Sequence, residues 1–170
     1  MDPLFLLARI LHIVLGVFWA GTMIFNAAFL LPAIRDTGPD GGKVAAALMR
    51  RGFLNFVPAA AALNLLAGLW LLWKVSAGFD SVYMRSAIGI TYSAGAALAF
   101  VAFGIGVGVM RRSVIKAAAL TQSAVGATET EGAAQLARAQ ALRLRAFRAS
   151  RWVAVLLSLT AIAMAVGRYV

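Results

Sequence analysis

The chain contains a single histidine, and this residue is the first candidate for chemistry. Arg9 precedes His12 by three residues, so a helix would place both side chains on nearly the same side. The absence of cysteine excludes thiolate metal sites, disulfides and a cysteine nucleophile. No Asp or Glu lies deep within an apolar run. The sequence therefore does not indicate a proton relay, a cation pathway or a Ser-His-Asp hydrolase.

An imidazole close to several cations matches what a tetrapyrrole needs from a protein. In this hypothesis Nε2 of His12 binds the metal, and Arg9 or Arg85 pairs with a propionate, with Lys74 at the same level. One histidine gives one axial ligand, which leaves a five-coordinate haem, a methionine partner, a symmetric dimer or a magnesium tetrapyrrole. Met23 is excluded as that partner, because it lies about 16 Å further along the helix axis. The alternative is a neutral imidazole bonded to a neighbouring carbonyl or hydroxyl, with cations that extend to the interface.

Four long apolar runs must position these residues. Apolar residues make up 62% of the 170-residue chain, whereas a soluble domain has about 45–50%. A helix needs about 20 residues to cross the hydrocarbon layer. The runs that satisfy this length cover about residues 4–34, 53–79, 83–110 and 152–170. We therefore expect an all-α fold, an integral membrane four-helix bundle in which residues 1–170 form one domain.

The basic residues between the runs predict an orientation. The chain has sixteen Lys and Arg against six Asp and Glu. The loop after the first run and the loop of residues 111–151 carry most of these cations, and the positive-inside rule places both loops in the cytoplasm. Both termini then face outward, as expected for a multi-pass protein of the bacterial inner membrane. Orientation accounts for the basic charge without nucleic acid, and Gly104–Gly108 follows no strand, so it is not a phosphate loop.

The loop of residues 111–151 is predicted to contain a basic helical extension before the fourth span. Its apolar residues at helical spacing are Ala133, Leu136, Ala137, Leu144 and Phe147. We interpret this side as a surface for anionic lipid or a partner, or as a solvated continuation of the span. Within the spans, the expected use of Asn26, Asn55 and Asn64 is interhelical hydrogen bonding.

The first span also carries a family resemblance. It reads Leu11-His12-Ile13, then Trp19-Ala20-Gly21, then Phe29-Leu30-Leu31-Pro32-Ala33. This resembles the opening helix of the copper resistance protein D-like membrane families, and it is similar to the HemJ-type protoporphyrinogen oxidase family. The resemblance implies a compact helical membrane fold and a haem- or metal-related role with His12 at the ligand position. The sequence departs from that pattern in having no second histidine.

Three functions follow as hypotheses. The first is a small membrane protein that binds haem b or another tetrapyrrole through His12, for electron transfer. The second is a non-catalytic accessory subunit of a larger membrane complex, which the scarcity of polar residues in the spans favours. The third, implied by the resemblance, is an enzyme of the porphyrinogen oxidase type. The expected partners are membrane lipid and either other membrane subunits or a second copy of the chain.

Overall fold

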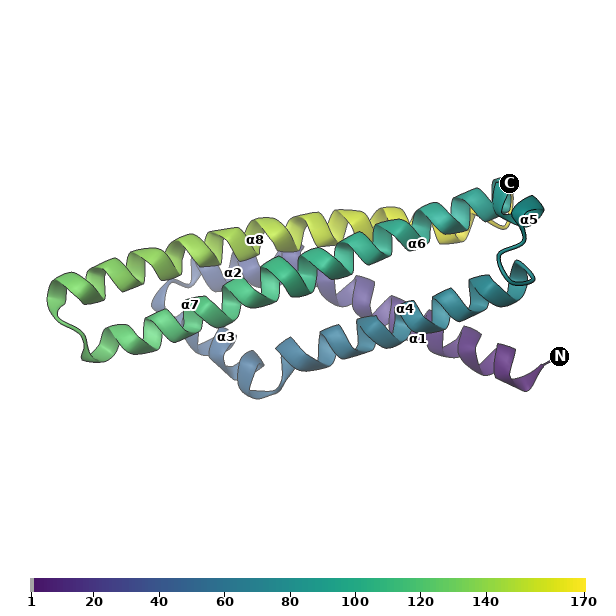
Figure 1. Cartoon of the computed structure of the whole chain (residues 1–170). Helices are drawn as coiled ribbons and strands as arrows, with labels where there is room; N and C mark the ends of the chain where they lie inside the picture. Colours follow the sequence, from purple (N-terminus) through teal and green to yellow (C-terminus); the bar gives the residue numbers. More distant parts are fainter. Residues whose placement is uncertain (1) are drawn as a thin grey trace.

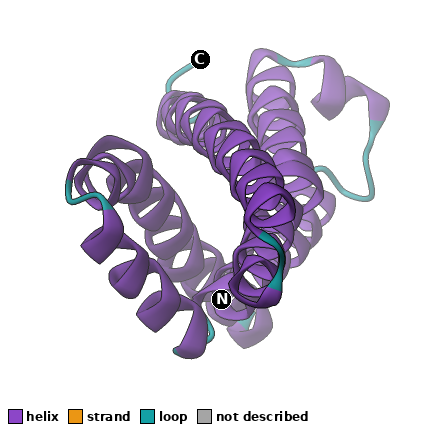
Figure 2. Cartoon of the chain, turned by 90° about the vertical axis from the view of Figure 1, so that its left-hand side faces the viewer, coloured by secondary structure: helices purple, strands orange, loops and turns teal. Residues whose placement is uncertain are grey.

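The computed structural model describes residues 2–170, and these residues form helices joined by short turns, with no strand (Figure 2). Four continuous helical stretches are long and apolar enough to cross a membrane. They are Pro3–Asp36, Phe53–Val75, Ala87–Gly126 and Glu129–Val166. The predicted all-α architecture with four long apolar helices is confirmed.

The first stretch comprises α1 (Pro3–Phe25), a π-helical turn η1 (Asn26–Leu30) and α2 (Leu31–Asp36). The carboxylate of Asp2 caps the start of α1 by accepting from the Leu4 amide at 2.9 Å. The π turn ends two residues before Pro32, and it includes Ala28, whose carbonyl the proline ring would otherwise meet and to which Pro32 has no N–H to donate. The wider turn relieves that clash without ending the helix. After Gly38, a short helix α3 (Pro39–Arg50) follows.

The second stretch, α4 (Phe53–Val75), is shorter than the predicted span of residues 53–79. The reason is local backbone geometry, because Ala77, Gly78 and Phe79 all have positive φ and cannot continue a helix. The carboxylate of Asp80 then caps a short helix, α5 (Ser81–Arg85).

The third and fourth stretches extend far beyond the predicted spans of residues 83–110 and 152–170. The third consists of α6 (Ala87–Ile105), the π-helical η2 (Gly106–Arg111), α7 (Arg112–Ser123) and η3 (Ala124–Gly126). It begins at Ala87 because Ser86 is extended and its hydroxyl caps the Gly89 amide at 3.1 Å. The fourth is α8 (Glu129–Val166), which starts with a capping box between Thr128 and Glu131. Residues 111–151 thus form a helical hairpin.

The helices pack as two pairs, α1 with α4 and α6–α7 with α8 (Figure 1). The pairs meet in an apolar core made by Trp19, Met23, Val57, Ala61, Leu65, Ala99, Ala102, Val153 and Leu157. Beyond this core, α8 packs against α7 through buried small residues at heptad spacing, which include Ala139 and Ala146. Leu136 and Leu144, on the predicted apolar side of the extension, remain 48% and 43% exposed because α7 packs against a different face.

The two ends of the bundle differ in charge. The N-terminus, the C-terminus and α5 lie at one end, which we call the terminal end (Figure 1). The other end holds α2, α3, α7 and the first half of α8, and we call it the basic end. Twelve of the sixteen Lys and Arg residues fall within residues 35–51 and 111–151, which form or adjoin the basic end, and the other four are Arg9, Lys74, Arg85 and Arg168, toward the terminal end.

Candidate functional site

The inward face of α1 carries His12 in line with the core. His12, Gly16, Trp19 and Met23 recur at spacings of three and four residues, which places them on one side of a helix. Trp19 and Met23 are buried in the core, whereas His12 is half-buried two turns nearer the terminal end. The helix that packs against this face is α4, through Val57, Ala61, Asn64 and Gly68.

A hydrogen bond to the backbone of α4 fixes the orientation of the imidazole. The Nδ1 atom of His12 lies 3.0 Å from the carbonyl oxygen of Asn64. A carbonyl can only accept, so Nδ1 carries the hydrogen and donates it. In the neutral ring the lone pair is then on Nε2. Metal-binding histidines use the same arrangement, in which one ring N–H bonds a carbonyl and the other nitrogen is the ligand.

Gly68 makes room for the imidazole. A Cβ at position 68 would lie 2.6 Å from Cε1 of His12 and 2.9 Å from Nδ1, so no larger residue fits without moving the ring. Sequence reasoning missed Gly68. The available signal was a glycine one helical turn after Asn64, in a helix otherwise dominated by large apolar residues.

Asn64 is 6% exposed and contributes its backbone carbonyl to the site. Its side-chain Oδ1 faces Gly16, where an added Cβ would lie 3.3 Å away, and it has no hydrogen-bond donor within residues 2–170. The interhelical hydrogen bond predicted for the Asn64 side chain is therefore not formed within residues 2–170, and α1 bonds the main-chain carbonyl of Asn64 instead. Asn55 makes the expected bond with its side chain, which accepts from Arg111.

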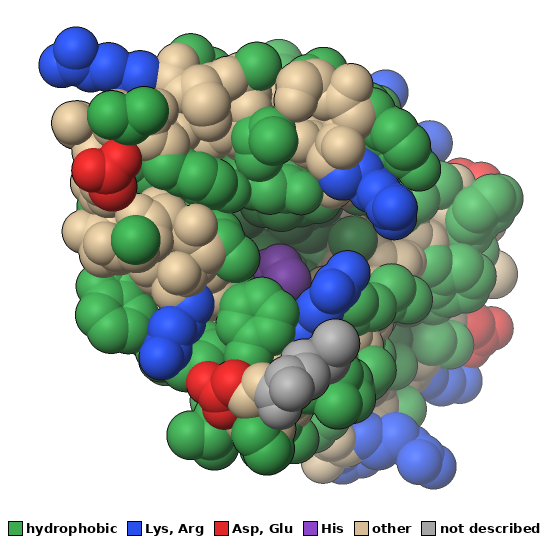
Figure 3. Space-filling view, turned by 90° about the vertical axis from the view of Figure 1, so that its right-hand side faces the viewer, with side chains coloured by type: hydrophobic (Ala, Val, Ile, Leu, Met, Phe, Trp, Pro, Cys, Tyr) green, Lys and Arg blue, Asp and Glu red, His purple; other side chains and the backbone are tan. Residues whose placement is uncertain are grey.

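Figure 3 shows the terminal end as a hollowed surface, with the imidazole on its floor and Lys and Arg side chains on several sides. The cations predicted for this level are Arg9, Lys74 and Arg85, and all three are exposed. The ammonium of Lys74 lies over the rings of its own helix, 5.4 Å from Trp70 and 5.5 Å from Trp73. Arg9 and Arg85 make no ion pair or hydrogen bond within the described part of the chain.

The structure thus gathers His12, Arg9, Lys74 and Arg85 at one end without a hydrogen bond from any of these cations to the imidazole. Residues 2–170 contain no cluster of three or more His, Cys, Asp or Glu side chains that could hold a bare metal ion. A single imidazole is, however, enough as the axial ligand of a metal whose equatorial ligands are the nitrogens of a tetrapyrrole. The donor set of this site therefore fits a tetrapyrrole better than a free ion. In α5, at the same end of the bundle, burial raises the pKa of Tyr83, and Tyr92 raises it further.

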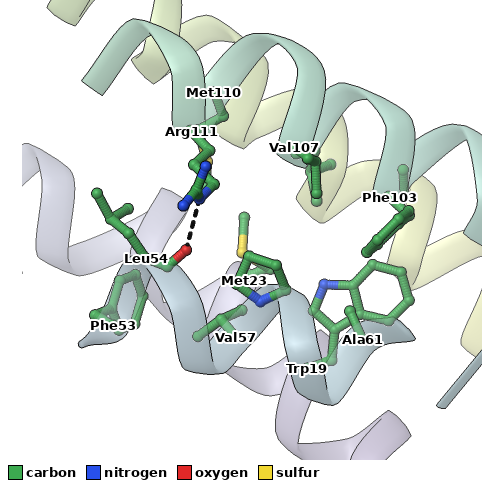
Figure 4. Close-up of a pocket in the computed structure, with 14 residues that line it drawn as sticks. Trp19, Met23, Phe53, Leu54, Val57, Ala61, Phe103, Val107, Met110 and Arg111 are labelled. Carbon is green, nitrogen blue, oxygen red and sulfur yellow. Dashed lines mark hydrogen bonds between the residues drawn. The ribbon is translucent and has the colours of Figure 1, made fainter. Parts of the chain in front are cut away.

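A second feature lies in the middle of the bundle, toward the basic end. An apolar cavity of about 30 Å³ is lined by Trp19, Met23, Val57, Phe103 and Met110, with Arg111 beside it (Figure 4). This volume is close to that of one water molecule, so the cavity cannot hold a tetrapyrrole. Of the cavity and the hollow at the terminal end, only the hollow contains the imidazole of His12.

Arg111 joins η2 to the first turns of α4 beside that cavity. Its Nε donates to the carbonyl of Leu54 at 2.9 Å (Figure 4). Its Nη2 donates to Oδ1 of Asn55 at 2.9 Å. The Leu54 carbonyl would normally accept from the residue four positions later, but that residue is Pro58, which has no N–H. Arg111 therefore satisfies a backbone acceptor that the helix leaves open.

No protein-family model, curated protein or solved structure matches this chain.

Proposed function

We propose that the chain is an integral membrane protein of four spans, with the basic end in the cytoplasm and both termini on the outer side. The four long apolar helices support insertion. The unequal division of cations, twelve against four, supports the orientation through the positive-inside rule. The positive-inside rule holds for the bacterial inner membrane, so we propose this membrane as the location of the chain.

Within that membrane the proposed function is binding of haem b or a related tetrapyrrole through Nε2 of His12. The observation that carries this proposal is the Nδ1–H bond to the Asn64 carbonyl, which leaves Nε2 as the free ligand atom. The half-buried ring on the floor of the hollow adds to it (Figure 3).

The cations of the terminal end supply the counter-charges. Arg9 and Arg85 are exposed and have no partner among residues 2–170, so either guanidinium is available for a propionate. Lys74 contributes positive charge at the same level while stacked on Trp70 and Trp73. A bound haem would supply one-electron transfer, which the chain's own side chains cannot provide.

The single imidazole limits the coordination that this chain can give. Met23 is buried in the core, 1% exposed, so it is unavailable as a second axial ligand near His12. Without a methionine from elsewhere at the terminal end, where Met84 and Met164 lie, the metal would be five-coordinate or shared by two copies of the chain that each contribute His12.

An absorption spectrum of the purified protein tests the proposal. We expect a Soret band in the wild type that is lost or strongly shifted in His12→Ala. A matched control is Asn26→Ala, which removes a buried polar side chain of the same span far from the site and should keep the band. No band in the wild type, or an unchanged band in His12→Ala, would refute tetrapyrrole binding through His12.

A second candidate function is that of a non-catalytic accessory subunit. The observation that favours it is a set of large apolar side chains exposed at the basic end, beyond the apolar spans. They are Ile115, 40% exposed, Val125, 88%, Leu136, 48%, and Leu144, 43%. Lipid would not cover these positions, whereas a partner subunit would. Purification in a mild detergent distinguishes the two states, because an accessory subunit should elute in a larger assembly and a lone protein as a monomer.

A further inference from the structure

A groove on the outside of the bundle separates the first stretch from α8, near the basic end. Its volume is about 560 Å³, and its walls include Ile24, Ala27, Ala28, Phe147, Ala154 and Ser158. Small residues on both helices create the opening, since alanine fills little of the space between them. The groove lies on the outer surface of the helices, so in a membrane it would face lipid.

The interior of the groove offers an environment for hydrocarbon. Apart from its cation, its lining residues are apolar except for Ser158. The hydroxyl of Ser158 donates to the Ala154 carbonyl of its own helix at 2.9 Å, so it presents no free donor. An acyl chain could therefore lie in the groove without leaving a polar group unsatisfied.

Two arginines lie at the basic end of the groove. Arg151 is a lining residue one helical turn after Phe147 and is exposed. The guanidinium of Arg35 lies 5.8 Å from the centre of the Phe147 ring. Both arginines occupy the level at which the apolar parts of α2 and α8 end, which is where phospholipid phosphates lie in a bilayer.

Arg35 has one competing partner. Its Nε lies 3.6 Å from a carboxylate oxygen of Asp36, and both side chains are well exposed, at 64% and 70%. An exposed pair of this kind contributes little. A phosphate that accepts from two guanidinium groups can therefore compete for Arg35.

From these observations we propose that the groove is a binding site for an anionic phospholipid of the cytoplasmic leaflet. One acyl chain lies between η1 and α8, and the phosphate lies between Arg35 and Arg151. A second apolar helix is a poorer occupant, because it would bury Arg151 without a counter-charge. The inference rests on the proposed membrane orientation, but it is independent of His12 and of any tetrapyrrole.

Lipid titration of the full chain in detergent, followed by native mass spectrometry, tests the inference. The probes are dioleoylphosphatidylglycerol and dioleoylphosphatidylcholine. We expect the anionic lipid to remain bound and the zwitterionic lipid to dissociate. The double variant Arg35→Gln/Arg151→Gln should weaken binding of the anionic lipid by about tenfold. The matched control Arg50→Gln/Arg112→Gln removes the same charge from exposed positions outside the groove and should retain wild-type affinity.

Ala154→Leu, which fills the groove without changing charge, should also lower affinity for the anionic lipid. Equal retention of both lipids would overturn the inference, and so would equal loss in the two double variants, which would indicate a non-specific attraction to the basic end. Failure of the proposed orientation gives a different result, because an impermeant thiol reagent would then label Gln122→Cys and not Ser81→Cys in intact cells, whichever lipid is bound.

Discussion

Replacement of Gly68 by alanine is the change that most directly tests how His12 is held. The new Cβ would lie 2.6 Å from Cε1 of His12 and 2.9 Å from Nδ1. Carbon atoms pack best at about 3.5–4.0 Å, so the imidazole must move by about 1 Å. Its bond to the Asn64 carbonyl is already 3.0 Å long, and a displacement of that size would break it.

The expected cost follows from two opposing contributions. Overpacking costs about 1–3 kcal/mol, and loss of the hydrogen bond costs about 0.5–1.5 kcal/mol. Alanine in place of glycine within a helix recovers about 0.5–1 kcal/mol. The net loss in the free energy of unfolding is therefore about 2 kcal/mol, which lowers the Tm of a chain of this length by about 4–8 °C.

Thermal unfolding in detergent, followed by circular dichroism, measures this loss. Gly104→Ala is the matched control, because a Cβ on that α6 glycine meets nothing within 4 Å and should be neutral or slightly stabilising. In a His12→Ala background the Gly68→Ala change should lose its cost, because its collision partner is gone. Equal stability of Gly68→Ala and Gly104→Ala, or an unchanged cost without His12, would refute the placement of the imidazole on Gly68.

Three further predictions concern the rest of the bundle. Arg111→Ala should lower the free energy of unfolding by about 1–3 kcal/mol, because the Leu54 carbonyl loses its donor; chemical or thermal unfolding measures it, and Arg111→Lys should not restore both bonds. Thr128→Ala should remove the capping box and cost about 0.5–2 kcal/mol, with faster amide exchange in the first turns of α8 and unchanged exchange in α4. Because the chain has no cysteine, single substitutions report topology cleanly: an impermeant thiol reagent should label Ser81→Cys in intact cells and leave Gln122→Cys unlabelled. The reverse labelling pattern would contradict the proposed orientation, because it would place the basic end on the outer side.

The sequence predicted the helices better than it predicted where they end. The length and continuity of the apolar runs were enough to identify four long helices. The ends depended on local geometry that hydropathy does not contain, such as the positive φ of Ala77 and Phe79 and the extended Ser86 that caps α6. The α7–α8 hairpin was predicted only in part, since its seam consists of small residues, and alanines carry a weak hydrophobic signal.

The candidate site, like the helices, could be predicted from the sequence only in part. His12 could be singled out because it is the only histidine. Its hydrogen-bond partner could not, because the acceptor is a main-chain carbonyl of Asn64, and any residue has such a group. The register of α1 against α4, which brings Gly68 opposite the imidazole, emerges from packing along the whole pair. The bond from Arg111 had a better signal, because Pro58 leaves the Leu54 carbonyl without a helical donor.

The most direct test of tetrapyrrole binding is a titration of haemin into the purified, cofactor-free protein in detergent, followed by Soret absorbance. We expect saturable binding at no more than one haem per chain, loss of that binding in His12→Ala, and its partial recovery in this variant when free imidazole is added. Arg9→Gln and Arg85→Gln should weaken binding while leaving the position of the band unchanged. Absence of saturable binding by the wild type, or the same affinity in His12→Ala, would contradict tetrapyrrole binding through His12.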